Sequence, residues 1–467
     1  MKRLFLTALV ITACDARVSF RRSDIEAAPV GEGLPPGFLL GAATSSHQVE
    51  GNNTNDWTEW EKGSFEDGSP HIHDQSVSGA ATDSYNRFDE DLALLKTLGA
   101  NTYRFSVEWS RLEPKENQWR EDVANRYLEW TLKLRQAGIE PMVTLHHFTL
   151  PTWVAEQGGW ENEQTLFRFT SFVFKVATKL GAQVDLWCTV NEPNVYAVQG
   201  YIDGIWPPGK KDSRAAALVL ARLIEAHAFA TSALRVADTV DADGDGRAVL
   251  SGLAHHVRVF QPASNSTLDT TVAGLTDDFF NEAIVRAART GRIQLSVPGE
   301  IEIDREVIDL KGSFDYLGLN YYTRDHVRAD LGDPSLSKQY VPKGRPVNQL
   351  GWDIYPEGLY QFLRRFGQEG WPIYITENGI ADAEGTERPY FLRAHLYAVE
   401  RALAEGVDVR GYYHWSLLDN FEWAEGYVPR FGLYRVDFDS PEKARTPTEA
   451  VETFRDIAQR AGLSPQP

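Results

Sequence analysis

Two glutamates, each at the end of a β-rich apolar run, are the residues best suited to chemistry. Glu192 stands in Thr-Val-Asn-Glu-Pro and Glu377 in Ile-Thr-Glu-Asn-Gly. One glutamate among 66 acidic residues is by default a surface residue, but a carboxylate at the end of a buried strand costs free energy unless it is paired or used. Two such carboxyl groups supply what acetal cleavage requires, a proton donor and either a nucleophile or a base for water. The pair therefore predicts a glycoside-cleaving site.

The stereochemical outcome of such a reaction depends on how far apart the two carboxyl groups lie. A separation of roughly 5 Å fits retention of the anomeric configuration, and more than about 6.5 Å fits inversion. The spacing of the two residues along the chain does not fix this distance, so both outcomes stay open at this point.

The elements that must position these residues are eight short β-rich runs that alternate with longer segments of helical periodicity. The runs are 38–45, 102–109, 141–147, 184–191, 249–260, 314–322, 373–377 and 409–416. In the intervening segments, apolar residues recur three and four positions apart, as in Leu92, Leu95 and Leu98, which is typical of helices that cover a sheet. Eight parallel strands close a barrel, so we predict an α/β fold, a single-domain (β/α)8 TIM barrel. The alternative, an open doubly wound sheet, calls for a glycine-rich phosphate loop after the first strand, which residues 41–44 do not supply.

A barrel of this kind carries its reactive side chains at the carboxyl ends of the strands. Polar or aromatic residues stand at these positions in seven of the eight runs: Gln48, Arg104, His147, Asn191 with Glu192, Tyr322, Glu377 and Trp415. Polarity scattered over a surface would not follow strand ends so consistently. We expect these side chains to share one site.

The composition narrows the class of ligand. The formal net charge of −19 and the lack of a basic run in the body argue against a nucleic-acid partner, because phosphate binding needs clustered Lys and Arg. The 13 tryptophans fit a carbohydrate ligand, since sugars present apolar C–H faces to aromatic rings, although most of these rings belong to the core. No cofactor is expected.

The amino terminus is predicted to direct export. Lys2 and Arg3 precede an apolar stretch over 4–13 that is too short to span a bilayer. Residues 11–14, Ile-Thr-Ala-Cys, resemble a bacterial lipobox, in which cleavage precedes a lipidated cysteine, here Cys14; a plain secretory signal is the alternative. We therefore expect a lipoprotein signal peptide at 1–13, a polar tether at 14–33 and the catalytic barrel at 34–467. Membrane contact would occur through the lipid on Cys14, in the periplasm or at the cell surface.

Five motifs together resemble glycoside hydrolase family 1, the β-glucosidase family, from about residue 34 to the end of the chain. They are the two glutamate motifs, Gly-Ala-Ala-Thr-Ser-Ser-His-Gln-Val-Glu-Gly over 41–51, Trp-Ser-Leu-Leu-Asp-Asn-Phe-Glu-Trp over 415–423, and Arg-Phe-Gly-Leu-Tyr over 430–434. The resemblance implies a retaining enzyme that hydrolyses a β-glucoside or a short β-linked oligosaccharide, with galactosyl and fucosyl residues as further candidates.

The resemblance also assigns roles to individual residues. Glu192 corresponds to the acid/base and Glu377 to the nucleophile, while Arg104 and Tyr322 correspond to residues that keep the nucleophile ionised and oriented, as a cation and a hydroxyl donor do. The residues that match the sugar-binding set are Gln48, His147, Asn191, Trp415, Glu422 and Trp423.

Two positions bear on which sugar is bound. Phe148 stands where the family usually has Trp after the histidine, so one indole N–H donor to a sugar hydroxyl is lost. The phospho-β-glycosidases carry other residues where this chain has Glu422 and Trp423, and a negative Glu422 would repel a 6-phosphate. A phospho-β-glycosidase and a non-catalytic glycan receptor on the same fold are the alternative functions.

One acidic stretch has a spacing seen in calcium loops. Asp241, Asp243 and Asp245 alternate as in the first half of such a loop, but Gly252 replaces the bidentate Glu expected at its twelfth position. Whether these residues bind calcium or form a solvated acidic turn is left open.

Overall fold

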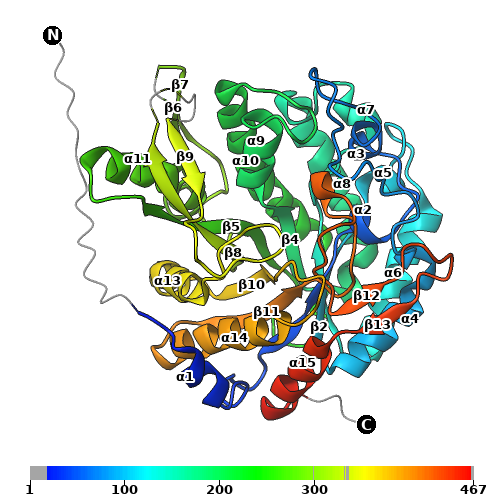
Figure 1. Ribbon diagram of the computed structural model, residues 1–467. Helices are drawn as coiled ribbons and strands as arrows, with labels where there is room; N and C mark the ends of the chain where they lie inside the picture. Colours follow the sequence, from blue (N-terminus) through cyan, green and yellow to red (C-terminus); the bar gives the residue numbers. More distant parts are fainter. Residues whose placement is uncertain (1–17, 298, 331, 333–335, 464–467) are drawn as a thin grey trace.

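A computed structural model of the chain describes residues 18–297, 299–330, 332 and 336–463 (Figure 1). Eight parallel strands form its central barrel: β1 (Leu39–Ala43), β2 (Thr102–Ser106), β3 (Glu140–Thr144), β4 (Leu186–Asn191), β5 (Leu250–Pro262), β8 (Leu317–Ala329), β10 (Ile373–Asn378) and β11 (Val409–Trp415). Each strand pairs with the next along the chain, and β11 pairs with β1, which closes the ring. The predicted barrel and all eight of its predicted strands are confirmed.

In the described part of the chain, each barrel strand is followed by a helix that packs outside the ring (Figure 1). These helices are α4 (Ser84–Leu98), α6 (Glu121–Gln136), α8 (Gln164–Leu180), α10 (Ser213–Ala237), α12 (Ala283–Thr290), α13 (Pro356–Phe366), α14 (Arg388–Ala404) and α15 (Glu449–Arg460). Leu95 and Leu98 on α4 are buried, as the apolar spacing predicts. By length and apolar composition α10 could cross a membrane, but most of its apolar stretch is buried within this fold, where it packs against α8.

Additional elements lie in the loops. After the early strands come α2 (Ser46–Val49), α3 (Asp56–Trp60), α5 (Trp109–Leu112), α7 (Thr152–Ala155) and α9 (Pro193–Tyr201). Between β5 and β8 the chain forms α11 (Thr267–Asp277), the π-helical turn η3 (Asp278–Glu282) and a hairpin of β6 (Arg292–Val297) and β7 (Ile301–Glu306). Strand β9 (Ser337–Tyr340) pairs antiparallel with the end of β8, and β12 (Tyr434–Val436) pairs with β13 (Arg445–Pro447). The loops after β4 and β5 therefore carry most of the additional structure beside the carboxyl ends of the strands.

The segment before the barrel is packed against it. Helix α1 (Arg22–Ala27) lies beside α14 (Figure 1), and Ile25 and Val30 are fully buried. The carboxylate of Glu400 on α14 accepts hydrogen bonds from the backbone N–H groups of Gly31 and Gly33 at 2.7 and 2.9 Å. The tether predicted for 14–33 is therefore wrong over 18–33, because Ile25 and Val30 within this polar stretch pack against the barrel. The predicted signal peptide and Cys14 lie outside the described residues.

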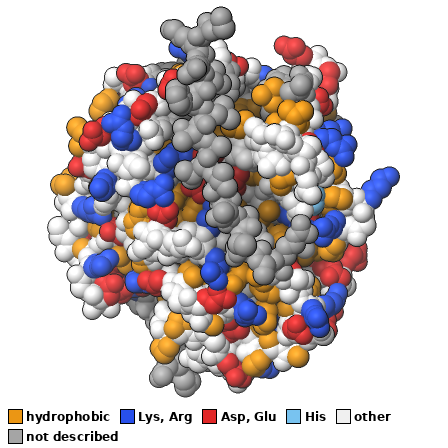
Figure 2. All heavy atoms as spheres, turned by 90° about the vertical axis from the view of Figure 1, so that its left-hand side faces the viewer, with side chains coloured by type: hydrophobic (Ala, Val, Ile, Leu, Met, Phe, Trp, Pro, Cys, Tyr) orange, Lys and Arg blue, Asp and Glu red, His pale blue; other side chains and the backbone are white. Residues whose placement is uncertain are grey.

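The charge on the surface is mixed. Among the described residues on the face in Figure 2, Lys and Arg side chains are interspersed with Asp and Glu side chains. This face thus lacks the extended positive field that would attract a nucleic acid.

Candidate active site

A cleft of about 1480 Å³ opens at the carboxyl ends of the barrel strands. It is lined by seven of the residues singled out in the sequence: His147, Glu192, Tyr322, Glu377, Trp415, Glu422 and Trp423. The other three, Gln48, Arg104 and Asn191, are buried and hydrogen-bonded to members of this set. The barrel thus brings every predicted site residue together, although they come from positions 48 to 423 of the chain.

Glu377 lies on β10 with a different donor at each carboxylate oxygen. Arg104 donates from Nη1 to Oε1 at 2.6 Å, and Tyr322 donates from Oη to Oε2 at 2.8 Å. All three side chains are buried. A charge-assisted bond from arginine and a phenolic hydroxyl together hold this carboxyl group in one orientation.

Glu192 follows β4 directly and precedes α9. Its backbone adopts a left-handed conformation, with φ of 44°, which turns the chain sharply between strand and helix. The Oε1 atom lies 2.9 Å from His256 Nδ1 and accepts a hydrogen bond from Asn320 Nδ2 at 2.8 Å. The sequence analysis missed both partners. The sequence analysis named no site residue on the fifth run, 249–260. The two adjacent histidines there, His255 and His256, were the signal that could have indicated a partner for Glu192.

The two carboxyl groups titrate together. Burial raises the pKa of the Glu377 carboxyl to about 7; the charge on Glu192 adds to this increase, and Arg104 and Tyr322 oppose it. At Glu192, burial alone would raise the pKa, but the hydrogen bonds from His256 and Asn320, together with the positive charge that a protonated imidazole would place beside the carboxyl group, lower it below its ordinary value. Arg104 is charged at every relevant pH, whereas an imidazole is charged only after binding a proton. We therefore place one shared proton on Glu192 and the negative charge on Glu377.

A polar group of side chains forms the end of the cleft near Trp415. Gln48 Nε2 donates to Asn420 Oδ1 and to the backbone oxygen of Phe421, both at 2.9 Å, and it lies 3.5 Å from Glu422 Oε2. Trp415 donates from Nε1 to Glu422 Oε1 at 3.3 Å. Long contacts of this kind at Glu422 leave its oxygens able to exchange protein partners for the hydroxyls of a bound sugar.

Burial raises the pKa of Glu422 to about 8, because its hydrogen bond from Trp415 offsets only part of the desolvation. At neutral pH this carboxyl group is therefore mainly protonated. The expected repulsion of a 6-phosphate by a negative Glu422 therefore does not apply to the protonated carboxyl group. The side chains that form hydrogen bonds with Glu422 in the described structure are those of Gln48, Trp415 and Asn420. All three are neutral, so none of them would balance the charge of a phosphate.

His147 is a buried, neutral imidazole. Burial, with the charge of Arg104, lowers its pKa well below the ordinary value. Arg104 donates to Asn191 Oδ1 at 2.7 Å, so the amide of Asn191 turns Nδ2 toward His147 Nε2, at 3.3 Å. Nε2 then accepts and Nδ1 carries the proton; Nδ1 is buried and has no hydrogen-bond partner in the described structure. The histidine thus holds one buried N–H donor that no group of the described protein accepts.

Aromatic rings form one side of the pocket. The imidazole of His147 lies nearly parallel to the rings of Trp415 and Trp423, with centroids 5.8 and 6.0 Å away. Phe148 packs edge-on against Trp423 and Trp206, at 5.2 and 4.8 Å between centroids. At position 148 the pocket therefore offers an apolar edge where an indole would offer an N–H donor.

In the acidic stretch at 241–245, the aspartate side chains accept hydrogen bonds from backbone N–H groups of the same turn. Asp241, Asp243 and Asp245 are exposed, with carboxylate oxygens close enough to share an ion. However, Asp241 accepts the backbone N–H groups of Gly244 and Gly246, at 2.7 and 2.9 Å, and Asp243 that of Asp245, at 2.9 Å. These bonds account for the acidic residues without an ion, which supports the interpretation as a solvated turn.

Comparisons with known proteins agree with this geometry. Residues 30–463 match the family model described as glycosyl hydrolase family 1. A 1,4-beta-D-glucan glucohydrolase of Thermotoga neapolitana is 34% identical over 88% of this chain and 99% of its own, and a beta-galactosidase of Pyrococcus woesei is 31% identical over 92% and 98%. Among solved structures, a beta-glycosidase from Pyrococcus horikoshii is 36% identical, with a TM-score of 0.81 over 94% of this chain and 97% of its own.

Proposed function

Because this chain belongs to glycosyl hydrolase family 1, we propose that it removes nonreducing-end β-D-glucosyl residues with Glu377 as nucleophile and Glu192 as acid/base. It is a retaining β-glycosidase, and its relatives include both beta-glucosidases and beta-galactosidases. The observation that carries the assignment of the two roles is their contrasting contacts: a permanent cation at 2.6 Å holds Glu377, whereas an imidazole and an amide hold Glu192.

In the first step, Glu192 transfers its proton to the glycosidic oxygen while an oxygen of Glu377 attacks the anomeric carbon from the opposite face. The bond to the leaving group breaks, the aglycone leaves as an alcohol, and an ester joins the sugar to Glu377. Arg104 and Tyr322 support this step because they fix the attacking carboxylate in one orientation. The step consumes the negative charge on Glu377.

In the second step, Glu192 acts as the base. The ester carries no charge, so Glu192 no longer experiences repulsion from Glu377 and stays ionised after giving up its proton. It then accepts a proton from water as the water oxygen attacks the anomeric carbon and displaces Glu377. Two inversions at the same carbon give net retention, and both carboxyl groups return to their starting states.

The sugar is proposed to bind at the polar end of the cleft. Gln48, Glu422 and Trp423 would contact hydroxyls there, His147 and Asn191 would contact others, and Trp415 would face the ring. The buried N–H of His147 Nδ1 and the weakly held oxygens of Glu422 support this placement. Because such groups lose their hydrogen bonds when a hydroxyl is missing or inverted, we expect glucosides to be preferred over galactosides and fucosides.

The test uses purified enzyme with aryl β-glucoside, β-galactoside, β-fucoside and glucoside 6-phosphate, and a matched pair of variants. With azide, Glu377→Ala should regain turnover and release the α-glycosyl azide, because azide attacks in place of the missing nucleophile. Glu192→Ala should instead give the β-glycosyl azide, because azide attacks the covalent intermediate. The same anomer from both variants would refute the two roles, and preferred turnover of the 6-phosphate would refute the unphosphorylated substrate.

Export and lipid attachment at Cys14 are proposed on the sequence of residues 1–14, which lie outside the described residues. The observation in support is the lipobox-like Ile-Thr-Ala-Cys after an apolar stretch. The intact mass of the protein, expressed in a bacterium that processes lipoproteins, should show cleavage before Cys14 and an added lipid. A measured mass without lipid would contradict the proposed lipid anchor.

A further inference from the structure

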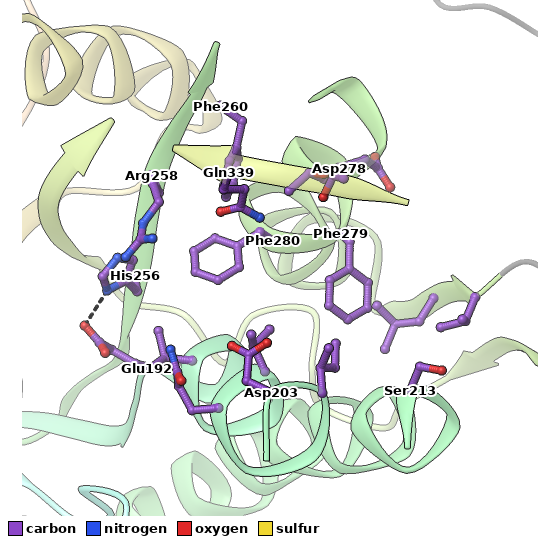
Figure 3. Close-up of a pocket in the computed structure, with 18 of the residues that line it drawn as sticks. Glu192, Asp203, Ser213, His256, Arg258, Phe260, Asp278, Phe279, Phe280 and Gln339 are labelled. Atoms are coloured by element: carbon purple, nitrogen blue, oxygen red, sulfur yellow. Dashed lines mark hydrogen bonds and ion pairs between the residues drawn. The ribbon is translucent and has the colours of Figure 1, made fainter. Parts of the chain in front are cut away.

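The imidazole ring of His256 has one hydrogen-bond partner in the described structure, the carboxyl group of Glu192. Figure 3 shows the two side chains facing each other, joined through His256 Nδ1 and Glu192 Oε1. The other ring nitrogen, Nε2, is buried and has no partner among the described residues. Leaving a buried polar atom unpaired costs free energy. The place of this ring is therefore better explained by its contact with Glu192 than by packing alone.

Neighbouring side chains hold the ring of His256 in place. The ring lies nearly parallel to that of Tyr322 on β8, with centroids 5.8 Å apart and planes 24° apart. Phe280 in η3 packs edge-on against it, at 5.6 Å between centroids. The side-chain amide of Asn194 donates to the backbone oxygen of His256 at 2.8 Å. With ring and backbone both held, Nδ1 stays at a fixed place beside Glu192.

The direction of the hydrogen bonds around Glu192 follows from Arg104, whose guanidinium has donors only. Arg104 Nη2 donates to Asn191 Oδ1 at 2.7 Å. That oxygen also lies 3.2 Å from the amide of Asn320, so Asn320 turns Nδ2 toward it and toward Glu192 Oε1, at 2.8 Å. The hydroxyl of Thr376 agrees with this orientation, because it donates to Asn320 Oδ1 at 2.6 Å. Glu192 Oε1 is therefore an acceptor.

This orientation places the proton of Glu192 on its other oxygen. A protonated carboxyl group carries its proton on one oxygen and accepts hydrogen bonds best at the other. Since Oε1 accepts from Asn320, Oε2 carries the proton, and His256 must donate to Oε1 from Nδ1. Glu192 lines the cleft, and its printed side-chain hydrogen bonds within the described structure all end on Oε1. The proton on Oε2 thus has no acceptor among the described residues and is available to the glycosidic oxygen.

We propose that His256 is a positioning residue, which together with Asn320 occupies Oε1 of Glu192 and so keeps the transferable proton on Oε2. This inference rests on the proposed function, in which Glu192 is the acid/base. Without the donor at Nδ1, the carboxyl group is free to rotate or to carry its proton on Oε1, and part of the enzyme then holds the proton where it cannot be transferred. In the second step, the same contact leaves Oε2 to accept the proton from water.

The experiment compares two β-glucosides whose leaving groups differ in their need for a proton. Phenolate is a poor leaving group that needs the proton of Glu192, whereas 2,4-dinitrophenolate departs without one. General acid catalysis contributes about 10²–10⁴-fold, so His256→Leu should lower kcat/KM for phenyl glucoside by about tenfold or more. For the dinitrophenyl glucoside, kcat/KM should stay as in wild type. Its kcat and KM should fall together, because hydrolysis of the intermediate still uses Glu192 as base.

Two amide variants separate the donor from the bulk of the ring. His256→Asn places its amide nitrogen as many bonds from Cβ as ring Nδ1, so it can donate to Glu192 and should recover most of the lost kcat/KM for phenyl glucoside. His256→Gln places its amide nitrogen at the position of Nε2 and should behave like His256→Leu. If His256→Leu does not fold, this pair carries the test.

His255→Leu is the matched control on the same strand. The imidazole of His255 is fully buried, and its Nε2 lies 2.8 Å from the backbone oxygen of Asn281. It has no described hydrogen bond to Glu192. His255→Leu should lower the melting temperature and leave the ratio of the two kcat/KM values as in wild type.

The pH profile for phenyl glucoside gives a second readout. This reaction needs protonated Glu192, so kcat/KM falls as the pH rises through the pKa of that group. Burial raises the pKa of Glu192, and His256 lowers it through its hydrogen bond and its charge when protonated. The basic limb should therefore move to higher pH in His256→Leu and His256→Gln, and less in His256→Asn. Other charged or titratable side chains near this pair, retained in every variant, are Arg104, Arg258, Tyr322 and Glu377.

The outcomes separate this inference from the proposed function. Equal losses for the two glucosides, unchanged hydrolysis of phenyl glucoside in His256→Leu, or equal losses in His256→Asn and His256→Gln would each overturn the positioning role and leave the glycosidase intact. Failure of the wild-type enzyme to turn over any glycoside would overturn the proposed function itself.

Discussion

Replacing Tyr322 with phenylalanine tests how the nucleophile is kept ionised. In the structure the hydroxyl of Tyr322 donates to Glu377 Oε2 at 2.8 Å, while Arg104 holds the other oxygen. Tyr322→Phe removes one hydrogen bond to the charged form and leaves the aromatic ring in place. A hydrogen bond to a charged group contributes about 1.5–3 kcal/mol.

The expected effect is a shift in the acidic limb of the pH profile. Because one pKa unit corresponds to about 1.4 kcal/mol, losing this bond should raise the pKa of Glu377 by about one to two units. The reaction needs ionised Glu377, whose pKa is already raised to about 7, so kcat/KM should begin to fall at a higher pH in the variant. The smaller increase, about one pKa unit, applies if water fills the space left by the hydroxyl group and donates a hydrogen bond to Glu377 in its place.

The assay is kcat/KM for an aryl β-glucoside between about pH 4 and pH 9, since this quantity reports the ionisation of the free enzyme. Tyr321→Phe is the matched control, because its hydroxyl donates to the backbone oxygen of Tyr355 at 2.6 Å and has no described contact with Glu377. An acidic limb that stays in place in Tyr322→Phe, or that shifts equally in both variants, would refute the reasoning.

Three further predictions concern stability. Arg324→Met removes the guanidinium whose Nη2 lies 2.7 Å from Oδ2 of the buried Asp353. The unpaired carboxylate should lower the free energy of unfolding, measured by urea titration, by about 3–5 kcal/mol. As the control, removal of the exposed Arg120 should lower it by less than about 1 kcal/mol. Val30→Asp should destabilise the protein by about 3 kcal/mol or more, because it buries an unpaired charge at a fully buried position; a loss under 1 kcal/mol would mean that the segment before the barrel is not docked in solution. Addition of EDTA should leave the melting temperature unchanged, because the turn at Asp241 satisfies its own acidic groups, and a clear drop would instead establish a structural calcium ion.

The barrel was predictable because its signals are local. Each strand is a short β-rich run, and each covering helix repeats apolar residues three and four positions apart, so both can be recognised within a window of a few residues. Only the packing of residues 18–33 contradicted the prediction. The composition of that stretch is polar, and its burial depends on whether α14 offers a surface that fits Val30 and Ile25.

The candidate site was predictable as a list of residues but not as a set of contacts. The position of Glu192 and Glu377 at strand ends, with the motif resemblance, was enough to name the pair and its support by Arg104 and Tyr322. His256 and Asn320 were missed because a histidine or an asparagine within a strand has the same local pattern whether it packs in the core or contacts a carboxylate.

The sequence by itself determined the alternation of strands and helices, the two carboxyl groups and the family to which the chain belongs. The tertiary structure decided which partners surround each carboxyl group. His256 and Asn320 lie 64 and 128 positions from Glu192 along the chain, and they meet it because closure of the barrel sets β4, β5 and β8 side by side. The pKa of a carboxyl group depends on distances of a few ångströms to such neighbours, and local sequence patterns do not contain those distances.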